Sequence, residues 1–196
     1  MKKIGSNRII YLDVVKFLAI WMVCIGHSYL LVDMSRESIL NNWIYSFHMP
    51  LFMMLCGYFS LKSYDKALVP FLKQKTIQLL LPTVTISILT IIVCFLIDVP
   101  DIAIVARSEA IGGMWFLRTL FFCFVYTYLF KRFGWKDYYT AIGSIVLALI
   151  LPHGYFLQFN WMLIFFWLGY FLKCYREFYV KNRAFITMFS LLVFIL

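Results

Sequence analysis

Six apolar runs, separated by short polar connectors, dominate this chain and restrict what it can fold into. They are residues 9–32, 43–61, 77–97, 113–130, 138–152 and 155–172. A helix needs about 17 to 25 apolar residues to cross a bilayer. Hydrophobic residues make up 64% of the 196 and charged residues 14%, whereas soluble domains have about 45–50% and about 25%. The runs therefore predict an all-α, polytopic transmembrane helix bundle with about six complete spans.

A seventh apolar run, residues 184–196, has 13 residues. It would form about 20 Å of helix, whereas the hydrocarbon core is about 30 Å thick. We therefore expect residues 1–196 to form a single integral-membrane domain that is truncated at its carboxyl end. The first run resembles a signal peptide, but Asp13 and Lys16 interrupt it and no small-x-small cleavage site follows, so we expect a retained helix.

The positive charges alternate between the connectors in a way that predicts the orientation. On the amino-terminal side lie Lys2, Lys3, Arg8, Lys62, Lys66, Lys73, Lys75, Lys131, Arg132, Lys136, Lys173, Arg176, Lys181 and Arg183. The opposite side has only Arg36 and Arg107. The positive-inside rule then places the amino terminus in the cytoplasm of a multi-pass protein of the cell (plasma or inner) membrane. Because position explains the net charge of +9, we expect the lipid bilayer and not a nucleic acid as partner.

Ionisable residues inside spans are expensive, by about 2.5 to 3.5 kcal/mol, and each is a functional candidate. In the first span, Asp13, Lys16 and His27 share one helical face. The plainer interpretation is an i,i+3 ion pair between Asp13 and Lys16 at the helix entrance, with His27 as a hydrogen-bonded core residue. His48, in the second span, is expected at a depth similar to that of His27, beside the open backbone that Pro50 creates. Two histidines at one depth predict a proton-handling site.

Arg118, in the fourth span, shares a helical face with Trp115. In the plainer interpretation, Arg118 donates a hydrogen bond to a backbone carbonyl or its side chain snorkels outward. Its functional use would be to hold an anion or to polarise a carbonyl group.

Three strings in this order resemble the acyltransferase 3 family of integral-membrane acyltransferases. They are RIIYLDVVKFLAIWMVCIGHS at 8–28, FHMPLFMMLCGYF at 47–59 and MWFLRTLFF at 114–122. A basic segment ending in Leu-Leu-Pro at 80–82 lies between the second and the third. Lys75 and Gln78 stand where members of the family often carry an Arg pair, and members commonly have about ten spans.

The resemblance implies transfer of an acyl group, commonly acetyl, from acyl-CoA to a hydroxyl of a carbohydrate or lipid-linked acceptor in the cell envelope. His27 matches the catalytic histidine of the family, and we expect it to be the base. Arg8, Asp13, Lys16 and His48 match other motif positions, with His48 or Arg118 orienting the base or stabilising charge. The expected catalytic residues are His27, His48 and Asp13. The expected donor- and oxyanion-binding residues are Arg8, Lys16, Lys73, Lys75, Arg118 and Trp115.

We expect no metal and no bound cofactor, with acyl-CoA as the co-substrate, because no Gly-rich phosphate loop or metal-ligand cluster is visible. Direct transfer and a covalent acyl-histidine are both compatible with these residues. A transporter of a small anion or saccharide would use the same polar face and Arg118 as a path. A membrane scaffold without chemistry would explain the apolar runs but not His27, His48 and Arg118.

Overall fold

Every regular element that the computed structural model describes is a helix. The described residues are 10–31, 39–98, 100–112, 114–150 and 159–182. The elements are α1 (Ile10–Leu31), α2 (Ile39–Tyr58), the 3-10 turn η1 (Leu61–Ser63), α3 (Leu68–Lys75), the π-helical turn η2 (Thr76–Leu80), α4 (Leu81–Leu96), α5 (Ile102–Gly112), α6 (Trp115–Arg132), α7 (Asp137–Ile150), α8 (Phe159–Cys174) and α9 (Arg176–Lys181). The predicted all-α class is confirmed.

Each of the six predicted spans contains a helix, although the boundaries shift. Among the described residues, one continuous helix, Leu68–Leu96 with 29 residues, is long and apolar enough to cross a membrane, so the six-span count stays a prediction. The predicted seventh run and the turn at 152–154 lie outside the described residues.

Three predicted connectors contain a helix of their own, which corrects the sequence interpretation, and α9 lies in the one after the sixth span. The connector expected at 62–76 contains α3, so Lys73 and Lys75 lie on a helix and not on a loop. Helix α5 occupies the connector after the third span. Single-sequence hydropathy missed these helices because short helices with charged residues resemble loops on that measure.

A π-helical turn joins α3 to α4 beside a proline. The Leu81 amide donates to the Thr76 carbonyl, five residues earlier. Pro82 has no amide hydrogen, and its ring would clash with the carbonyl of Gln78 in a regular α-helix. The wider turn lets the helix continue past Pro82, and it begins directly after Lys75. Turns of this type occur often at functional sites.

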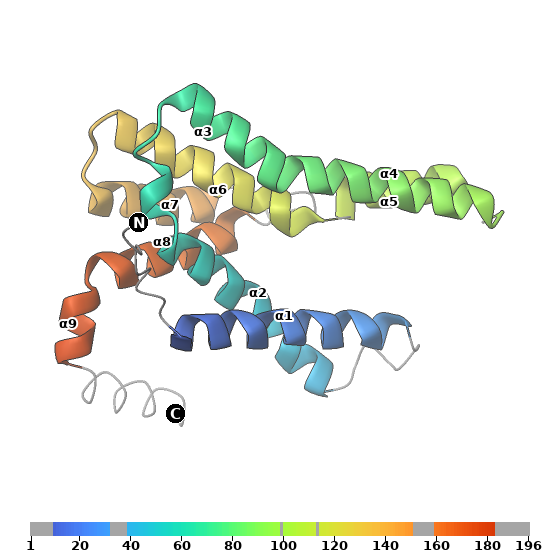
Figure 1. Ribbon diagram of the computed structural model, residues 1–196, viewed down its shortest axis with the longest axis horizontal. Helices are drawn as coiled ribbons and strands as arrows, with labels where there is room; N and C mark the ends of the chain where they lie inside the picture. The colour runs from blue at the N-terminus through green and yellow to red at the C-terminus, as the bar shows by residue number, and fades with distance from the viewer. Residues whose placement is uncertain (1–9, 32–38, 99, 113, 151–158, 183–196) are drawn as a thin grey trace, which may run out of the picture.

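Helices α4 and α5 form an antiparallel hairpin that projects from one end of the molecule (Figure 1). Asp98 and Asp101 have φ values of 54° and 58°, in the left-handed region that aspartate tolerates better than most residues. The Asp101 carbonyl accepts from the Ile104 amide at 2.8 Å and starts α5. The reversal therefore uses two short polar side chains in place of glycine.

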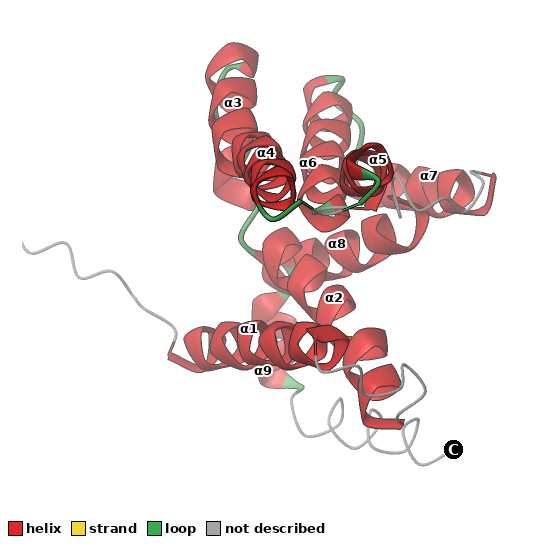
Figure 2. Ribbon diagram, turned by 90° about the vertical axis from the view of Figure 1, so that its right-hand side faces the viewer, coloured by secondary structure: helices red, strands yellow, loops and turns green. Residues whose placement is uncertain are grey.

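The helices form layers, with α1 and α9 on one side, α2 and α8 in the middle and α3–α4, α5, α6 and α7 on the other side (Figure 2). Helices α2 and α8 make the most extensive contact. A Cβ atom on Gly57 would collide with the carbonyl of Phe166, and one on Gly169 with the carbonyl of Met54. Two glycines therefore let the backbones of α2 and α8 touch, as small residues do in membrane helix pairs.

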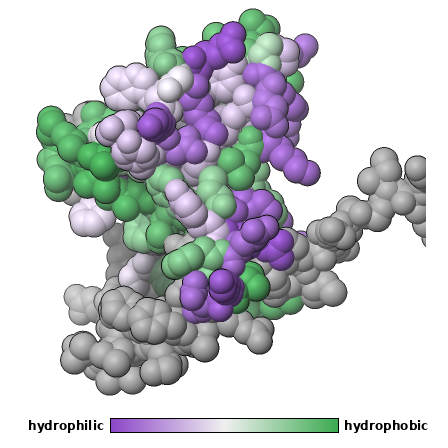
Figure 3. All heavy atoms as spheres, turned by 90° about the vertical axis from the view of Figure 1, so that its left-hand side faces the viewer, coloured by the Kyte–Doolittle hydropathy of each residue, from purple (hydrophilic) through white to green (hydrophobic). Residues whose placement is uncertain are grey.

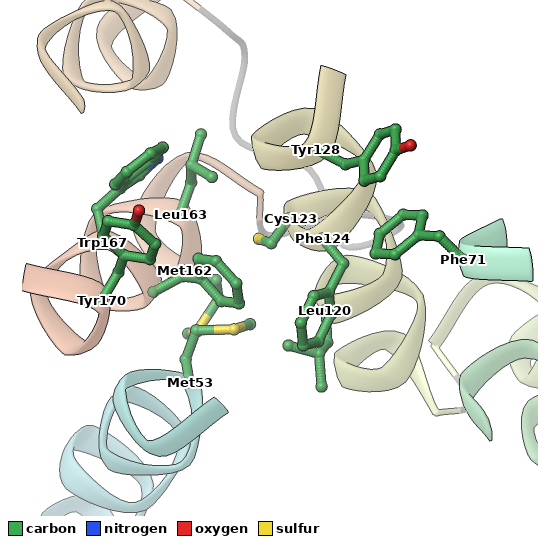
Figure 4. Close-up of a cluster of buried hydrophobic side chains, with 11 residues drawn as sticks. Met53, Phe71, Leu120, Cys123, Phe124, Tyr128, Met162, Leu163, Trp167 and Tyr170 are labelled. Carbon is green, nitrogen blue, oxygen red and sulfur yellow. The ribbon is translucent and has the colours of Figure 1, made fainter. Parts of the chain in front are cut away.

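The main core lies where α2, α3, α6 and α8 meet (Figure 4). It contains Met53, Phe71, Leu120, Cys123, Phe124, Tyr128, Met162, Leu163, Phe166, Trp167 and Tyr170. Leu120, Phe124 and Tyr128 are spaced by four residues, so they lie on one face of α6. A second cluster joins Ala19 of α1 to Leu55 and Tyr58 of α2. These two clusters hold α1, α2, α3 and α6 around the candidate site.

The basic connectors gather at one end, which we call the polar end: residues 59–67, 131–137 and 173–182. Figure 1 shows them together on the side opposite the α4–α5 turn, and hydrophilic residues are prominent in the view onto this end in Figure 3. Elsewhere, large apolar side chains are exposed, such as Phe17 at 65% and Leu149 at 82%. Such exposure exceeds what soluble monomers show and suits a lipid-facing surface.

Candidate functional site

An inner cavity of about 350 Å³ lies between α1, α2, α3 and α6. Its lining residues are Lys16, Ile20, Phe52, Leu55, Cys56, Phe59, Lys75 and Phe124. The wall is mostly apolar and carries two lysines from different helices. Both lysines were predicted as donor- or oxyanion-binding residues, and the fold brings them to one cavity.

Lys75 is the more enclosed of the two cations, with 7% of the residue exposed. Its Nζ lies 3.5 Å from the ring centroid of Phe124, a cation–π contact. The position at the last turn of α3, just before the π-helical turn, directs it toward α6. Lys73 is two residues away and therefore about 200° around the helix. It is exposed and lines no described cavity.

Lys16 enters the cavity from α1 and forms the predicted ion pair with Asp13, at 3.9 Å between Nζ and Oδ1. Its Nζ also lies 3.9 Å from the ring centroid of Phe59. The two side chains are 41% and 37% exposed, so the pair lies near the cavity entrance. Asp13 therefore holds Lys16 at the mouth, while Phe59 supplies a wall for its ammonium group.

His48 is buried in α2, with 1% of the residue exposed. Its Nδ1 is hydrogen-bonded to the backbone carbonyl of Ile44, one turn earlier. Because a carbonyl oxygen only accepts, Nδ1 carries the hydrogen, and Nε2 of the neutral ring is the basic nitrogen. The helix itself therefore selects the tautomer in which Nε2 can accept a proton.

The other predicted site residues either do not line the inner cavity or have side chains outside the described residues. His27 is on α1, about 16 Å along the helix from Lys16, but its side chain lies outside the described residues, as does Arg8. Trp115 and Arg118 begin α6, are half-buried and do not line the cavity. Phe124, which does line it, is six residues after Arg118, so the cavity and Arg118 lie at different levels of α6.

An outer cavity of about 550 Å³ opens at the polar end, and sequence reasoning did not identify it. Its lining residues are Tyr64, Asp65, Lys66, Ala67, Leu68, Tyr128, Lys131, Arg132, Trp135 and Asp137. In the sequence, Lys66, Lys131 and Arg132 indicate only the topology of the chain. The string KRFGWKD at 131–137, with basic and aromatic residues interleaved, was the available signal.

A polar network shapes the outer cavity. Asp137 accepts a hydrogen bond from the Tyr170 hydroxyl at 2.7 Å and pairs with Lys131 Nζ at 3.8 Å. The Tyr128 hydroxyl donates to the Lys66 carbonyl at 3.0 Å. Burial raises the pKa of the Tyr64 hydroxyl well above its usual value, so this group stays protonated. These contacts tie the loop before α3 to α6, α7 and α8.

Comparisons with known proteins identify the family of this chain. The profile of the acyltransferase 3 family, described as an acyltransferase domain, matches residues 9–196. A nodulation protein NolL of Mesorhizobium japonicum is 27% identical over 158 residues, which cover 75% of this chain and 42% of the relative. The NolL of Sinorhizobium fredii is 27% identical over 172 residues, which cover 76% and 43%.

The chain thus spans less than half the length of these curated relatives. No solved structure matches it. The family profile, however, covers nearly the whole chain and includes the strings that carry His27, His48 and Arg118. This chain belongs to the acyltransferase 3 family.

Proposed function

We propose that this chain is a membrane-bound acyltransferase that moves an acyl group, in the first instance acetyl, from acyl-CoA to a hydroxyl of a carbohydrate or lipid-linked acceptor of the cell envelope. The observation that carries this proposal is the inner cavity, where Lys16 and Lys75 face one largely apolar space. Family membership supports the reaction class. The exposed apolar helix faces support a multi-pass position in the cell membrane.

Acyl transfer from a thioester to an alcohol requires charge stabilisation at the carbonyl oxygen. The acceptor oxygen attacks the thioester carbonyl, a C–O bond forms and the C–S bond then breaks. Negative charge develops on the carbonyl oxygen before the thiolate leaves. We assign the stabilisation of that charge to Arg118, whose guanidinium group is always charged. Lys75 has a different role: it attracts an anionic part of acyl-CoA into the inner cavity, and the surrounding apolar wall screens this attraction less than water would.

The reaction also requires a base for the hydroxyl proton, which is later delivered to the departing thiolate. We assign this role to His27, the motif histidine of α1. His48 lies on the helix that packs against α1, and its Nε2 is the nitrogen able to accept a hydrogen bond or a proton. His48 therefore serves to orient His27 or to share its proton. The apolar wall of the inner cavity limits water and so protects the thioester from hydrolysis.

The test is a transfer assay on the full chain in lipid nanodiscs, with labelled acetyl-CoA and a carbohydrate acceptor. Lys75→Met should lower kcat/KM for transfer by about tenfold or more, mainly through a higher KM for acetyl-CoA, because a charge-assisted contact to the donor is lost. Lys62→Met is the matched control, because Lys62 is exposed and lines neither cavity. Flux of substrate across the membrane without a covalent product would instead support a transporter. Normal transfer by Lys75→Met would contradict the proposed role of the inner cavity.

A further inference from the structure

The outer cavity has an excess of positive charge that its own residues do not neutralise. Three cations, Lys66, Lys131 and Arg132, line it together with two carboxylates. Lys66 donates to the side-chain oxygen of Gln74 at 2.6 Å, a neutral partner. Its positive charge therefore remains uncompensated by that contact.

Asp137 and Arg132 differ in whether their charges are paired with a described residue. Asp137 is engaged by Lys131 and by the Tyr170 hydroxyl. Arg132 is exposed at the end of α6, and it forms no ion pair with a described residue. The planar guanidinium group, with its fork of donors, suits a phosphate group.

The cavity also presents an aromatic side chain to a ligand. Trp135 is 54% exposed and its ring lies 5.2 Å from the ring of Phe130, centroid to centroid. Tyr128, by contrast, is buried, stacked on Phe71 at 4.3 Å and hydrogen-bonded through its hydroxyl. Trp135 is therefore the most exposed of the aromatic residues that line the cavity, and Arg132 lines the same cavity.

We propose that the outer cavity binds a phosphorylated purine nucleotide, with the base against Trp135 and the phosphates held by Arg132, Lys131 and Lys66. Base–aromatic stacking and cation–phosphate contacts are the two interactions that recognise such a ligand. A volume of about 550 Å³ lies in the range of small-molecule sites. An anionic lipid headgroup could use the same cations, and the experiment below separates the two ligands.

The inference deepens the proposed function, on which it rests, because acyl-CoA ends in such a nucleotide. Tyr64 lines the outer cavity and Phe124 lines the inner one. Their ring centroids are 6.4 Å apart, so the two cavities are neighbours through this pair of aromatic side chains. A donor with its nucleotide in the outer cavity would have its thioester arm directed toward Lys75. Since the polar end is the side predicted to be cytoplasmic, the donor would enter from the cytoplasm.

The experiment is calorimetric titration of the full chain, in nanodiscs of zwitterionic lipid, with adenosine 3′,5′-bisphosphate. This probe contains the nucleotide and no thioester arm, so binding is measured independently of transfer. Arg132→Gln and Trp135→Leu should each weaken binding by about tenfold or more. Arg176→Gln, at the same end, and Trp161→Leu, with similar exposure, are the matched controls. We expect them to change the affinity by no more than about twofold.

Binding that is unaffected by Arg132→Gln and Trp135→Leu, or no binding of the probe, would overturn the proposal. The proposal would also be overturned if Arg132→Gln and Trp135→Leu changed only the binding of phosphatidylglycerol in the nanodiscs. The cations would then be assigned to lipid headgroups. Probe binding without acetyl transfer would keep the nucleotide site and contradict the proposed function. If Arg132→Gln transfers acetyl groups with a normal KM for acetyl-CoA, the proposed function is kept and the nucleotide site is contradicted.

Discussion

At the scale of single residues, the chemistry depends on how each polar group is held inside an apolar protein. His48 is held by the carbonyl of its own helix, which leaves Nε2 as the basic nitrogen. Lys16 is held by Asp13, and Lys75 by the ring of Phe124. The partners of His48 and Lys16 lie on the same helix as the group they hold, whereas the partner of Lys75 lies on α6, which packs against α3.

The histidines supply the first prediction. His27→Ala should lower acyl transfer by about 10² to 10⁴-fold per membrane-inserted molecule, because a general base contributes that much. The measurement is the ratio of labelled product to inserted protein, with His153→Ala, outside the three motif strings, as the control.

His48→Ala tests the second histidine in the same assay. Residues that act as a unit are not additive, so His27→Ala combined with His48→Ala should be little worse than His27→Ala alone. If His27→Ala instead reduces inserted protein and keeps more than about a tenth of the transfer per molecule, His27 is a packing residue, and His48 becomes the candidate base.

At the scale of elements, the contact between α2 and α8 organises the molecule. It is close because Gly57 and Gly169 each face a backbone carbonyl of the other helix. Gly57 belongs to the motif string that also contains His48. Gly57 therefore sets the distance between α8 and α2, the helix that carries His48. The motif string thus has a structural role as well as the proposed chemical one.

Gly57→Ala and Gly169→Ala should each destabilise the protein, since the added methyl group forces two backbones apart. Overpacking of this kind costs about 1–3 kcal/mol, which exceeds the gain of up to about 1 kcal/mol from alanine in a helix. A thermal unfolding midpoint lower by several degrees is expected in nanodiscs.

The matched control is Gly143→Ala on α7, where a Cβ atom would meet only the Tyr126 hydroxyl at 3.8 Å. This variant should be as stable as the parent chain or slightly more so. Equal stability of all three variants would show that α2 and α8 are not in backbone contact.

At the scale of the whole molecule, charge separates the two ends. The connectors with most lysines and arginines lie together at the polar end, and the α4–α5 turn lies at the other (Figure 1). A membrane protein oriented by the positive-inside rule needs this separation. The proposed nucleotide site depends on it, because the outer cavity opens at the polar end.

Accessibility labelling tests this orientation. In intact cells, Lys66→Cys and Lys136→Cys should resist a membrane-impermeant thiol reagent added from outside, because both lie at the polar end. Ala103→Cys, exposed near the α4–α5 turn, should react, and the parent chain measures the background from its five cysteines. External labelling of Lys66→Cys would reverse the orientation and place the nucleotide site outside the cell.

The sequence by itself determined the properties that are local along the chain. Apolar runs predicted the helices, and helical spacing predicted the ion pair between Asp13 and Lys16, which the structure contains. Both follow from hydropathy and from 3.6 residues per turn. Only the tertiary structure decided that Lys75 and not Lys73 enters the inner cavity, and that Tyr64, Arg132 and Trp135 share the outer one. The reason is physical: a cavity is made by which helices pack together and how closely, and small residues such as Gly57 set that distance between segments far apart in the chain.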